Sequence, residues 1–246
     1  MKCCVLEICC YASESVFISA EAGAHRVELC SNRKEGGTTP SYGSVVEAMK
    51  FPIEVCPILR PRGGDFLYTQ QEFNEMLRDA ELFGSLQTKG IVFGILKPTG
   101  EFDLPRMKNI IDCTKNQELI VHRAFDMCKD PFRAIEELID LGITRILTSG
   151  GKNTAIEGIE LLEKLLEKAN DRISIMAGSG INSGNIGKLK SIGIREFHAS
   201  ATHFLPSQME YRNNHIGMGS KTDPDEFRIQ QAEKSEIKSM LNILGQ

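Results

Sequence analysis

Two short segments near the start of the chain each place a glutamate two residues before a cysteine. They are Glu7 with Cys9, and Glu28 with Cys30. Residues two apart in an extended strand point to the same face, so each glutamate shares a face with its cysteine. A carboxylate on a buried face is costly unless it is paired or does chemistry, and a thiolate is a good ligand for soft metals. These residues therefore indicate a functional site inside the fold.

A cationic loop is expected at residues 60–66, directly after a strand-like run. It places Arg60 and Arg62 on either side of a proline, followed by two glycines and Asp65. Guanidinium groups bind carboxylates and phosphates through paired hydrogen bonds, so these residues are candidates for binding an anionic ligand. The alternative is a surface ion pair with Asp65, which would contribute little to stability.

Residues 122–126 bring together a histidine, an arginine and an aspartate. His122 can be interpreted as a general acid or base, as a metal ligand, or as a satisfied core histidine. His122 and Arg123 are successive positions of the strand predicted at 119–125, so their side chains point to opposite faces and only one of them is expected to enter the site directly. Arg123 and Asp126 are candidate ligand-binding residues, with the alternative that Asp126 holds Arg123 in place.

Two later segments, 148–151 and 177–181, are rich in glycine and small residues. Such turns expose backbone N–H groups that suit phosphate or another oxyanion, which makes Ser149, Gly150 and Gly178 candidate ligand-binding residues. A tight corner between a strand and a helix favours the same residues, so both interpretations stay open. Neither segment has the length of a dinucleotide-binding fingerprint, and no nucleotide cofactor is expected.

The last strand-like run, residues 196–200, alternates polar and apolar side chains. Glu196, His198 and Ser200 share the polar face, which makes His198 a second candidate acid or base and Ser200 a further candidate for binding the ligand. The inward positions of the predicted strands together form a polar set that is too rich for packing alone: Glu7, Cys9, Glu28, Cys30, Arg60, His122, Ser149, His198 and Ser200.

The elements that must position these residues alternate along the chain as strand-like runs and amphipathic helical segments. Strands are predicted at 5–9, 26–30, 53–60, 90–96, 119–125, 145–149, 173–178 and 196–200. Helices are predicted at 13–22, 43–50, 70–86, 104–115, 131–141, 154–168 and 184–192. Three of these helices are followed by a glycine just before the next strand, at Gly23, Gly142 and Gly193.

Eight such alternations without a long linker predict a single α/β domain over residues 1–246, a (β/α)₈ barrel of the TIM type. A doubly wound open sheet is the alternative. The C-terminal part, 206–246, breaks the alternation: residues 211–221 are loop-like, and an extra closing helix is predicted at 223–244. Asp223 would be its N-cap and Pro224 its first residue.

The composition describes an ordinary globular protein of 246 residues, 41% hydrophobic and 25% charged, with a formal net charge of −4. This charge gives no case for binding nucleic acid or an anionic membrane, and no apolar run is long enough to span a bilayer. The eight cysteines lack zinc-finger spacing and are expected to be reduced thiols. We therefore expect a cytoplasmic protein, and a homodimer or higher homo-oligomer because closed homo-oligomers are common.

Several segments of the chain resemble the signature segments of the CutC family. They are Glu7-x-Cys9 and residues 26–30, 35–41, 60–66, 122–126, 147–150 and 196–198, with 211–213 and 218–219 in the tail. The resemblance implies a single (β/α)₈ barrel, a cytoplasmic location and a role in copper homeostasis with Cu(I) binding. It also implies that Cys9 and Cys30 are the copper ligands, which agrees with the preference of Cu(I) for thiolates.

Two functions from different classes follow. The first is copper binding through Cys9 and Cys30, with His122 or His198 as helpers. The alternative is a barrel enzyme that performs isomerase or lyase chemistry on a small anionic or phosphorylated metabolite. In the enzyme, two arginines would bind the anion, a glutamate (Glu7 or Glu28) would be the base, and one of the two histidines would be the acid. A barrel that senses a metabolite without converting it is a third possibility.

Overall fold

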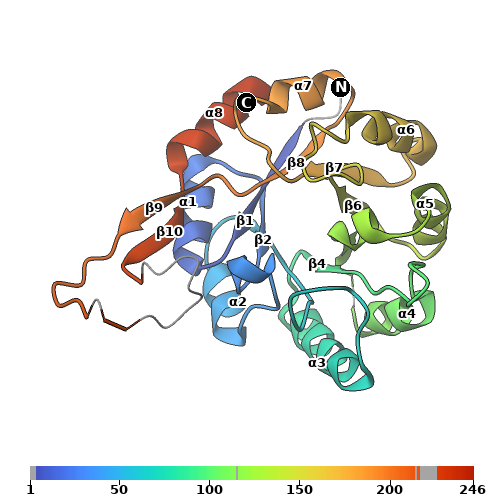
Figure 1. The fold of residues 1–246 in the computed structure, drawn as a ribbon, viewed down its shortest axis with the longest axis horizontal. Coiled ribbons are helices and arrows are strands. Elements are labelled where there is room, and N and C mark those ends of the chain that lie inside the picture. The colour runs from blue at the N-terminus through green and yellow to red at the C-terminus, as the bar shows by residue number, and fades with distance from the viewer. Residues whose placement is uncertain (1–3, 115, 214, 217–225) are drawn as a thin grey trace.

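The computed structural model describes residues 4–114, 116–213, 215–216 and 226–246, and within them eight parallel strands form a nearly closed barrel (Figure 1). The strands are β1 (Val5–Cys10), β2 (Arg26–Leu29), β3 (Glu54–Pro57), β4 (Gly90–Phe93), β5 (Glu118–Val121), β6 (Arg145–Thr148), β7 (Ser174–Gly178) and β8 (Glu196–Ala199). Their order is β3-β2-β1-β8-β7-β6-β5-β4, and a parallel bridge between Ile58 and Val92 links the chain after β3 to β4. The predicted (β/α)₈ barrel is confirmed, and the open-sheet alternative is wrong.

Helices surround the barrel (Figure 1). They are α1 (Ser13–Ala22), α2 (Tyr42–Ala48), α3 (Gln70–Leu86), α4 (Leu104–Cys113), α5 (Pro131–Asp140), α6 (Ile159–Ala169), α7 (Ile186–Ser191) and α8 (Lys234–Leu244). Short 3-10 helices lie at η1 (Arg33–Glu35) and η2 (Arg123–Met127). Helix α6 begins later than predicted because Thr154 and Glu157 bond to each other's backbone N–H and form a separate turn. Among the described helices, none combines the length and the apolarity that crossing a bilayer requires.

The predicted alternation of faces is seen on the first strands. Leu6 and Ile8 are fully buried in the large core between the sheet and the helices. Cys9 and Cys30 belong to a separate small cluster with Cys56, Ile58, Val92 and Ile120. The helix-facing side takes most of the aliphatic residues, and the side that faces the barrel axis holds thiols and charged groups beside a few aliphatic side chains. The strand pattern therefore decides which side chains can meet inside the barrel.

The glycines that follow three of the helices adopt the left-handed conformation expected of them. Gly23, Gly142 and Gly193 have φ values of 90°, 85° and 104°. Other residues adopt this region only with strain, so these glycines allow each helix to end sharply before the next strand. The sharp ends keep the strands in register around the barrel.

The C-terminal part differs from the prediction of one long helix. Residues 228–232 form strand β10 (Arg228–Ala232), which pairs antiparallel with β9 (Thr202–Pro206) in a hairpin that projects beyond the ring of helices (Figure 1). Only α8 is helical in the described part of this region. The strand forms because a partner strand distant in sequence satisfies its backbone, which local helix propensity does not anticipate. Asp223, Pro224 and residues 218–219 lie outside the described residues.

Candidate functional site at the barrel mouth

The floor of the barrel interior is a network of buried ion pairs at the N-terminal ends of the strands. Arg26 on β2 contacts the carboxylates of Glu7 and Glu196. Arg145 on β6 contacts Glu196 as well, together with Glu118 at 2.8 Å. Loss of one charge from such a network leaves its partner buried and uncompensated, which is strongly destabilising. The network therefore holds Glu7 in one position beneath the site.

Glu7 connects this floor to the layer above. Its Oε1 lies 2.8 Å from Nδ1 of His198 on β8. Burial opposes ionisation of Glu7, but Arg26 and His198 hold its pKa at about 2. Burial would also lower the pKa of His198, whereas contacts with Cys9, Glu7 and Glu28 raise that pKa well above its ordinary value. Each partner of this pair therefore stabilises the charged form of the other.

The two glutamate–cysteine motifs meet in a compact buried group formed by Cys9, Glu28 and Cys30. The two sulfur atoms are 4.0 Å apart. Oε2 of Glu28 lies 3.5 Å from Sγ of Cys9 and 3.4 Å from Sγ of Cys30. Nε2 of His198 lies 3.7 Å from the same carboxylate oxygen. The register of β1 with β2, in which Cys9 stands opposite Glu28, brings these side chains together.

Protons are shared unequally within this group. The hydrogen bond with Cys30, together with His198, lowers the pKa of the Cys9 thiol despite its burial. Burial and the neighbouring Cys9 raise the pKa of Cys30 well above its ordinary value. Burial and the charge on Cys9 also raise the pKa of Glu28, to about 8. The lowered pKa of Cys9 favours its thiolate, which is the form of cysteine that binds metals.

A cavity of about 240 Å³ opens above this group. Six of the predicted residues line it: Cys9, Glu28, Arg60, His122, Arg123 and His198. These residues belong to the C-terminal ends of the strands or to the segments that follow them. This is the end at which barrels of this type carry their functional sites.

Arg60 is buried at the cavity and is held by backbone carbonyl groups. Its Nη1 donates to the carbonyl oxygens of Glu35 (2.5 Å) and Gly37 (2.8 Å), and its Nη2 donates to that of Gly64 (2.8 Å). The ring of Phe66 packs against the guanidinium, with Cζ 5.1 Å from the ring centroid. Arg60 is therefore rigidly placed by the loop that follows β3.

His122 and Arg123 both line the cavity, and the prediction that only one of them does is wrong. Strand β5 ends at Val121, and His122 caps the 3-10 helix η2, where its Nδ1 accepts a hydrogen bond from the backbone N–H of Ala124 at 3.1 Å. The backbone turns at this point, so strand alternation no longer applies. Burial and the charge of Arg60 lower the pKa of His122 to about 3, so its imidazole is neutral.

The carboxylate of Asp126 accepts hydrogen bonds from backbone N–H groups of the segment that was predicted to bind an oxyanion. Its carboxylate accepts hydrogen bonds from the N–H groups of Ser149 (3.1 Å) and Gly151 (3.0 Å), and from the Ser149 hydroxyl (2.9 Å). It also pairs with Nε of Arg123 at 2.7 Å, so the alternative that Asp126 holds Arg123 in place is confirmed. The N–H of Gly150 donates to a neighbouring threonine hydroxyl. This loop therefore holds an internal carboxylate where an external anion was predicted.

Four other predicted ligand-binding residues lie away from the cavity lining. Arg62 pairs with Asp65 at 2.9 Å and with Glu72 at 2.6 Å, which is the surface ion pair considered as the alternative. Gly178 lies where a Cβ atom would be only 2.4 Å from a leucine side chain, so its role is close packing. Ser200 is exposed and follows the last residue of β8.

Several residues of the site were missed, although the alternation rule could have found three of them. Tyr11 lines the cavity and stands two residues after Cys9. Arg26 stands two residues before Glu28, and Arg145 four residues before Ser149, on faces that were already assigned inward. Phe66, in contrast, comes from a loop and carries no such signal.

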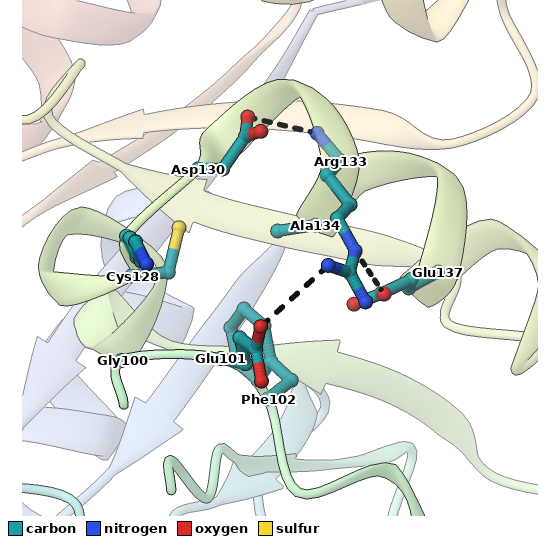
Figure 2. A pocket seen from close by; sticks show the side chains of 9 residues that line it. Gly100, Glu101, Phe102, Cys128, Asp130, Arg133, Ala134 and Glu137 are labelled. Carbon is teal, nitrogen blue, oxygen red and sulfur yellow. Dashed lines mark hydrogen bonds and ion pairs between the residues drawn. The ribbon is translucent and has the colours of Figure 1, made fainter. Parts of the chain in front are cut away.

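A smaller cavity of about 110 Å³ lies between residues 100–102 and the start of α5 (Figure 2). Arg133 reaches across it to Glu101 at 3.5 Å and to Glu137 at 2.7 Å (Figure 2). Its backbone N–H donates to the carboxylate of Asp130, which caps the helix. Arg133 is thus paired with two carboxylates of this cavity and is not left free for a ligand.

The Cys9–Glu28–Cys30 group has the donor atoms and spacing of a metal site. Its three ligand atoms lie within 4.8 Å of one another, and all three residues are buried. Two metal–sulfur bonds of about 2.3 Å would span the 4.0 Å between the sulfur atoms. Two thiolates in a buried position favour a soft ion such as Cu(I).

Comparison with known proteins agrees with this architecture. The family model described as CutC family matches residues 4–203. The chain is 45% identical over 240 residues to a family protein CutC of Parabacteroides distasonis, covering 96% of this chain and 99% of that protein. It is 43% identical over 247 residues to one of Bacteroides fragilis, covering 99% and 98%. A crystal structure from Streptococcus agalactiae, described as a candidate copper homeostasis protein CutC, aligns with a TM-score of 0.77 at 34% identity, covering 80% of this chain and 98% of that one. The chain therefore belongs to the CutC family.

Proposed function

We propose that this protein acts in copper homeostasis by binding Cu(I) through the thiolates of Cys9 and Cys30. The observation that carries the proposal is the pair of buried sulfur atoms 4.0 Å apart at the base of the barrel-mouth cavity. The description of the Streptococcus agalactiae relative as a candidate copper homeostasis protein supports the same function.

The surroundings of the two sulfurs favour a monovalent soft ion. The Cys9 thiolate supplies one negative charge, and release of the Cys30 proton on binding supplies a second. His198 sits beside Glu28 and contributes a positive charge that balances the bound complex. Glu28 offers one oxygen atom as an additional donor, which a thiophilic ion does not require.

A cytoplasmic location agrees with the state of the thiols. The cysteines of the described residues are all free, and reduced thiols are kept in a reducing compartment. A buried pair of free thiols is the form that takes up Cu(I) without a preceding reduction step. We therefore propose that the protein meets copper in the cytoplasm.

The alternative of an acid–base enzyme has less support. Glu7, one candidate base, lies beneath the cavity in contact with Arg26 and His198 and does not line it. His122, one candidate acid, has its pKa lowered by burial to about 3, far from the neutral range in which general acids work well. The other two candidates, Glu28 and His198, do line the cavity, but there they contact each other, and Glu28 contacts both sulfur atoms of the Cys9–Cys30 pair.

A competitive Cu(I) titration of fully reduced protein tests the proposal. Wild type, Cys9→Ser and Cys30→Ser are titrated anaerobically against a chromogenic Cu(I) chelator, with Cys113→Ser on α4 as the matched control. Changes outside the ligand sphere alone cost about 10–100-fold in metal affinity, so losing either thiolate should cost more than about 100-fold. The control should bind one copper per chain as tightly as wild type. Binding that survives both serine substitutions would contradict the proposal.

A further inference from the structure

We propose that the barrel-mouth cavity binds a small organic monocarboxylate, whose oxygen atoms accept hydrogen bonds from the guanidinium of Arg60 and from Nε2–H of His122. This goes beyond copper binding and uses neither of the two sulfur atoms. Three observations carry it: among the residues that the structure describes, an arginine has no counterion and a histidine donor has no acceptor, and both residues line one cavity.

Arg60 is a buried cation that has no carboxylate partner among the described residues. It is 6% exposed, and its three hydrogen bonds all go to neutral carbonyl oxygens. Its Nε is buried and has no acceptor in the described part of the chain. Burial of a charge is costly unless an opposite charge compensates it. The nearby Arg62 and Arg123 differ in this respect, because each has a carboxylate partner.

His122 presents a donor with a defined direction. Its Nδ1 accepts the N–H of Ala124, so in the neutral ring the proton must be on Nε2. This Nε2 is buried and has no partner among the described residues. An unsatisfied buried donor destabilises the folded protein, and a hydrogen bond to a ligand oxygen would remove that cost.

The two donors are part of one wall. Phe66 packs against both, with its ring centroid 5.1 Å from Cζ of Arg60 and 4.8 Å from the ring centroid of His122. Both residues line the same cavity of about 240 Å³. This volume is just below the range of roughly 300–1,000 Å³ in which drug-sized ligands bind, so the ligand is a small metabolite.

The charge of the cavity favours a monoanion over phosphate. One positive charge, that of Arg60, is uncompensated, whereas that of Arg123 is neutralised by Asp126. Glu35 lines the same cavity and would repel the second charge of a phosphate dianion. The backbone donors of the glycine-rich loop, which would suit phosphate, are occupied by Asp126. A carboxylate on a small organic molecule therefore fits best.

Calorimetric titration of reduced, copper-free, full-length protein tests this site. The probes are the monocarboxylates acetate and lactate, with inorganic phosphate as the competing oxyanion. Arg60→Met removes the charge, and His122→Asn removes the Nε2 donor while an asparagine oxygen can still cap η2. The matched control is Arg133→Ala, which removes an arginine that lines the other cavity and already has carboxylate partners. Unfolding midpoints of all variants are measured alongside.

We expect at least one carboxylate to bind, and each of Arg60→Met and His122→Asn to weaken it by at least about tenfold, as loss of a charge-assisted hydrogen bond does. Phosphate should bind at least about tenfold more weakly than that carboxylate, and Arg133→Ala should bind like wild type. Glu35→Gln should tighten binding roughly twofold to fivefold, because it removes a repelling charge at the rim.

The proposal is overturned if no carboxylate binds, if phosphate binds as tightly, or if His122→Asn binds like wild type. The histidine variant decides the question even if Arg60→Met proves unstable, because the two substitutions act on different elements. Copper binding is measured separately, so failure of the carboxylate site and failure of the copper site are distinguishable.

Discussion

Replacement of Glu7 by glutamine tests whether the buried ion-pair floor holds the site together. Glu7 is 1% exposed and contacts both Arg26 and His198. Its pKa is held at about 2 in the folded protein, against an ordinary value of 4.5. At about 1.4 kcal/mol per pKa unit, the charged form of this carboxyl contributes roughly 3 kcal/mol to stability at neutral pH. We expect Glu7→Gln to lower the free energy of unfolding by about that amount.

The stabilisation that the Glu7 carboxylate contributes should decrease as the pH falls. Because the pKa of Glu7 is lowered by folding, its contribution is fully present above the ordinary value of 4.5 and is lost as the pH falls toward about 2. The difference between wild type and Glu7→Gln should therefore be largest at pH 7 and shrink steadily below pH 4.5.

Urea unfolding, followed by circular dichroism at several pH values, measures this difference. The matched control is Glu47→Gln, which breaks an exposed pair with Lys50 and should cost no more than about 1 kcal/mol. A difference for Glu7→Gln of less than about 1 kcal/mol at pH 7 would refute the argument from buried charge. A difference that stays constant between pH 7 and pH 3 would refute it equally.

Three further predictions concern the parts of the site that surround the sulfur pair. The pKa of His122 is lowered from 6.5 to about 3, so acidification below pH 6.5 favours the unfolded chain by up to about 1.4 kcal/mol per pH unit. In urea unfolding, His122→Asn should therefore lose stability less steeply than wild type between pH 6 and pH 4. A Cβ atom at Gly94 would lie 2.9 Å from the ring of His122 and 2.9 Å from the methyl group of Ala124. Gly94→Ala should therefore lower the free energy of unfolding by about 1–3 kcal/mol, and an unchanged midpoint of urea unfolding would contradict this packing argument. His198→Gln removes the charge beside Glu28 and should weaken Cu(I) binding in the chelator competition by about 10–100-fold, with no loss of one-to-one stoichiometry.

Much of the barrel and of the sulfur site could be predicted because both follow from local periodicity. Glu7, Cys9, Glu28 and Cys30 lie on regular strands, where the face of each side chain depends only on its position in the alternation. Parallel pairing of neighbouring strands then brings the two motifs together without further information. The glycine before each new strand reports the end of a helix in the same local way.

Apart from Tyr11, Arg26 and Arg145, which the alternation of strand faces could have identified, the rest of the site depended on contacts between residues distant in sequence. The alternation argument failed at Arg123 because β5 ends at Val121 and the chain enters a 3-10 helix, a boundary set by the cap at His122. Ser149 was predicted to bind an external oxyanion. Its N–H group instead donates to the carboxylate of Asp126, a residue that is distant in sequence. Strand β10 was taken for helix because its pairing partner, β9, lies about twenty residues away and beyond a loop.

Copper K-edge X-ray absorption of the Cu(I)-loaded protein tests the central claim most directly. If Cys9 and Cys30 hold the ion, the spectrum of wild type will contain two sulfur scatterers at about 2.3 Å, and each of Cys9→Ser and Cys30→Ser will lose one of them. A first shell made only of nitrogen and oxygen, or a sulfur shell that is identical in wild type and both variants, would place the copper elsewhere and contradict the account.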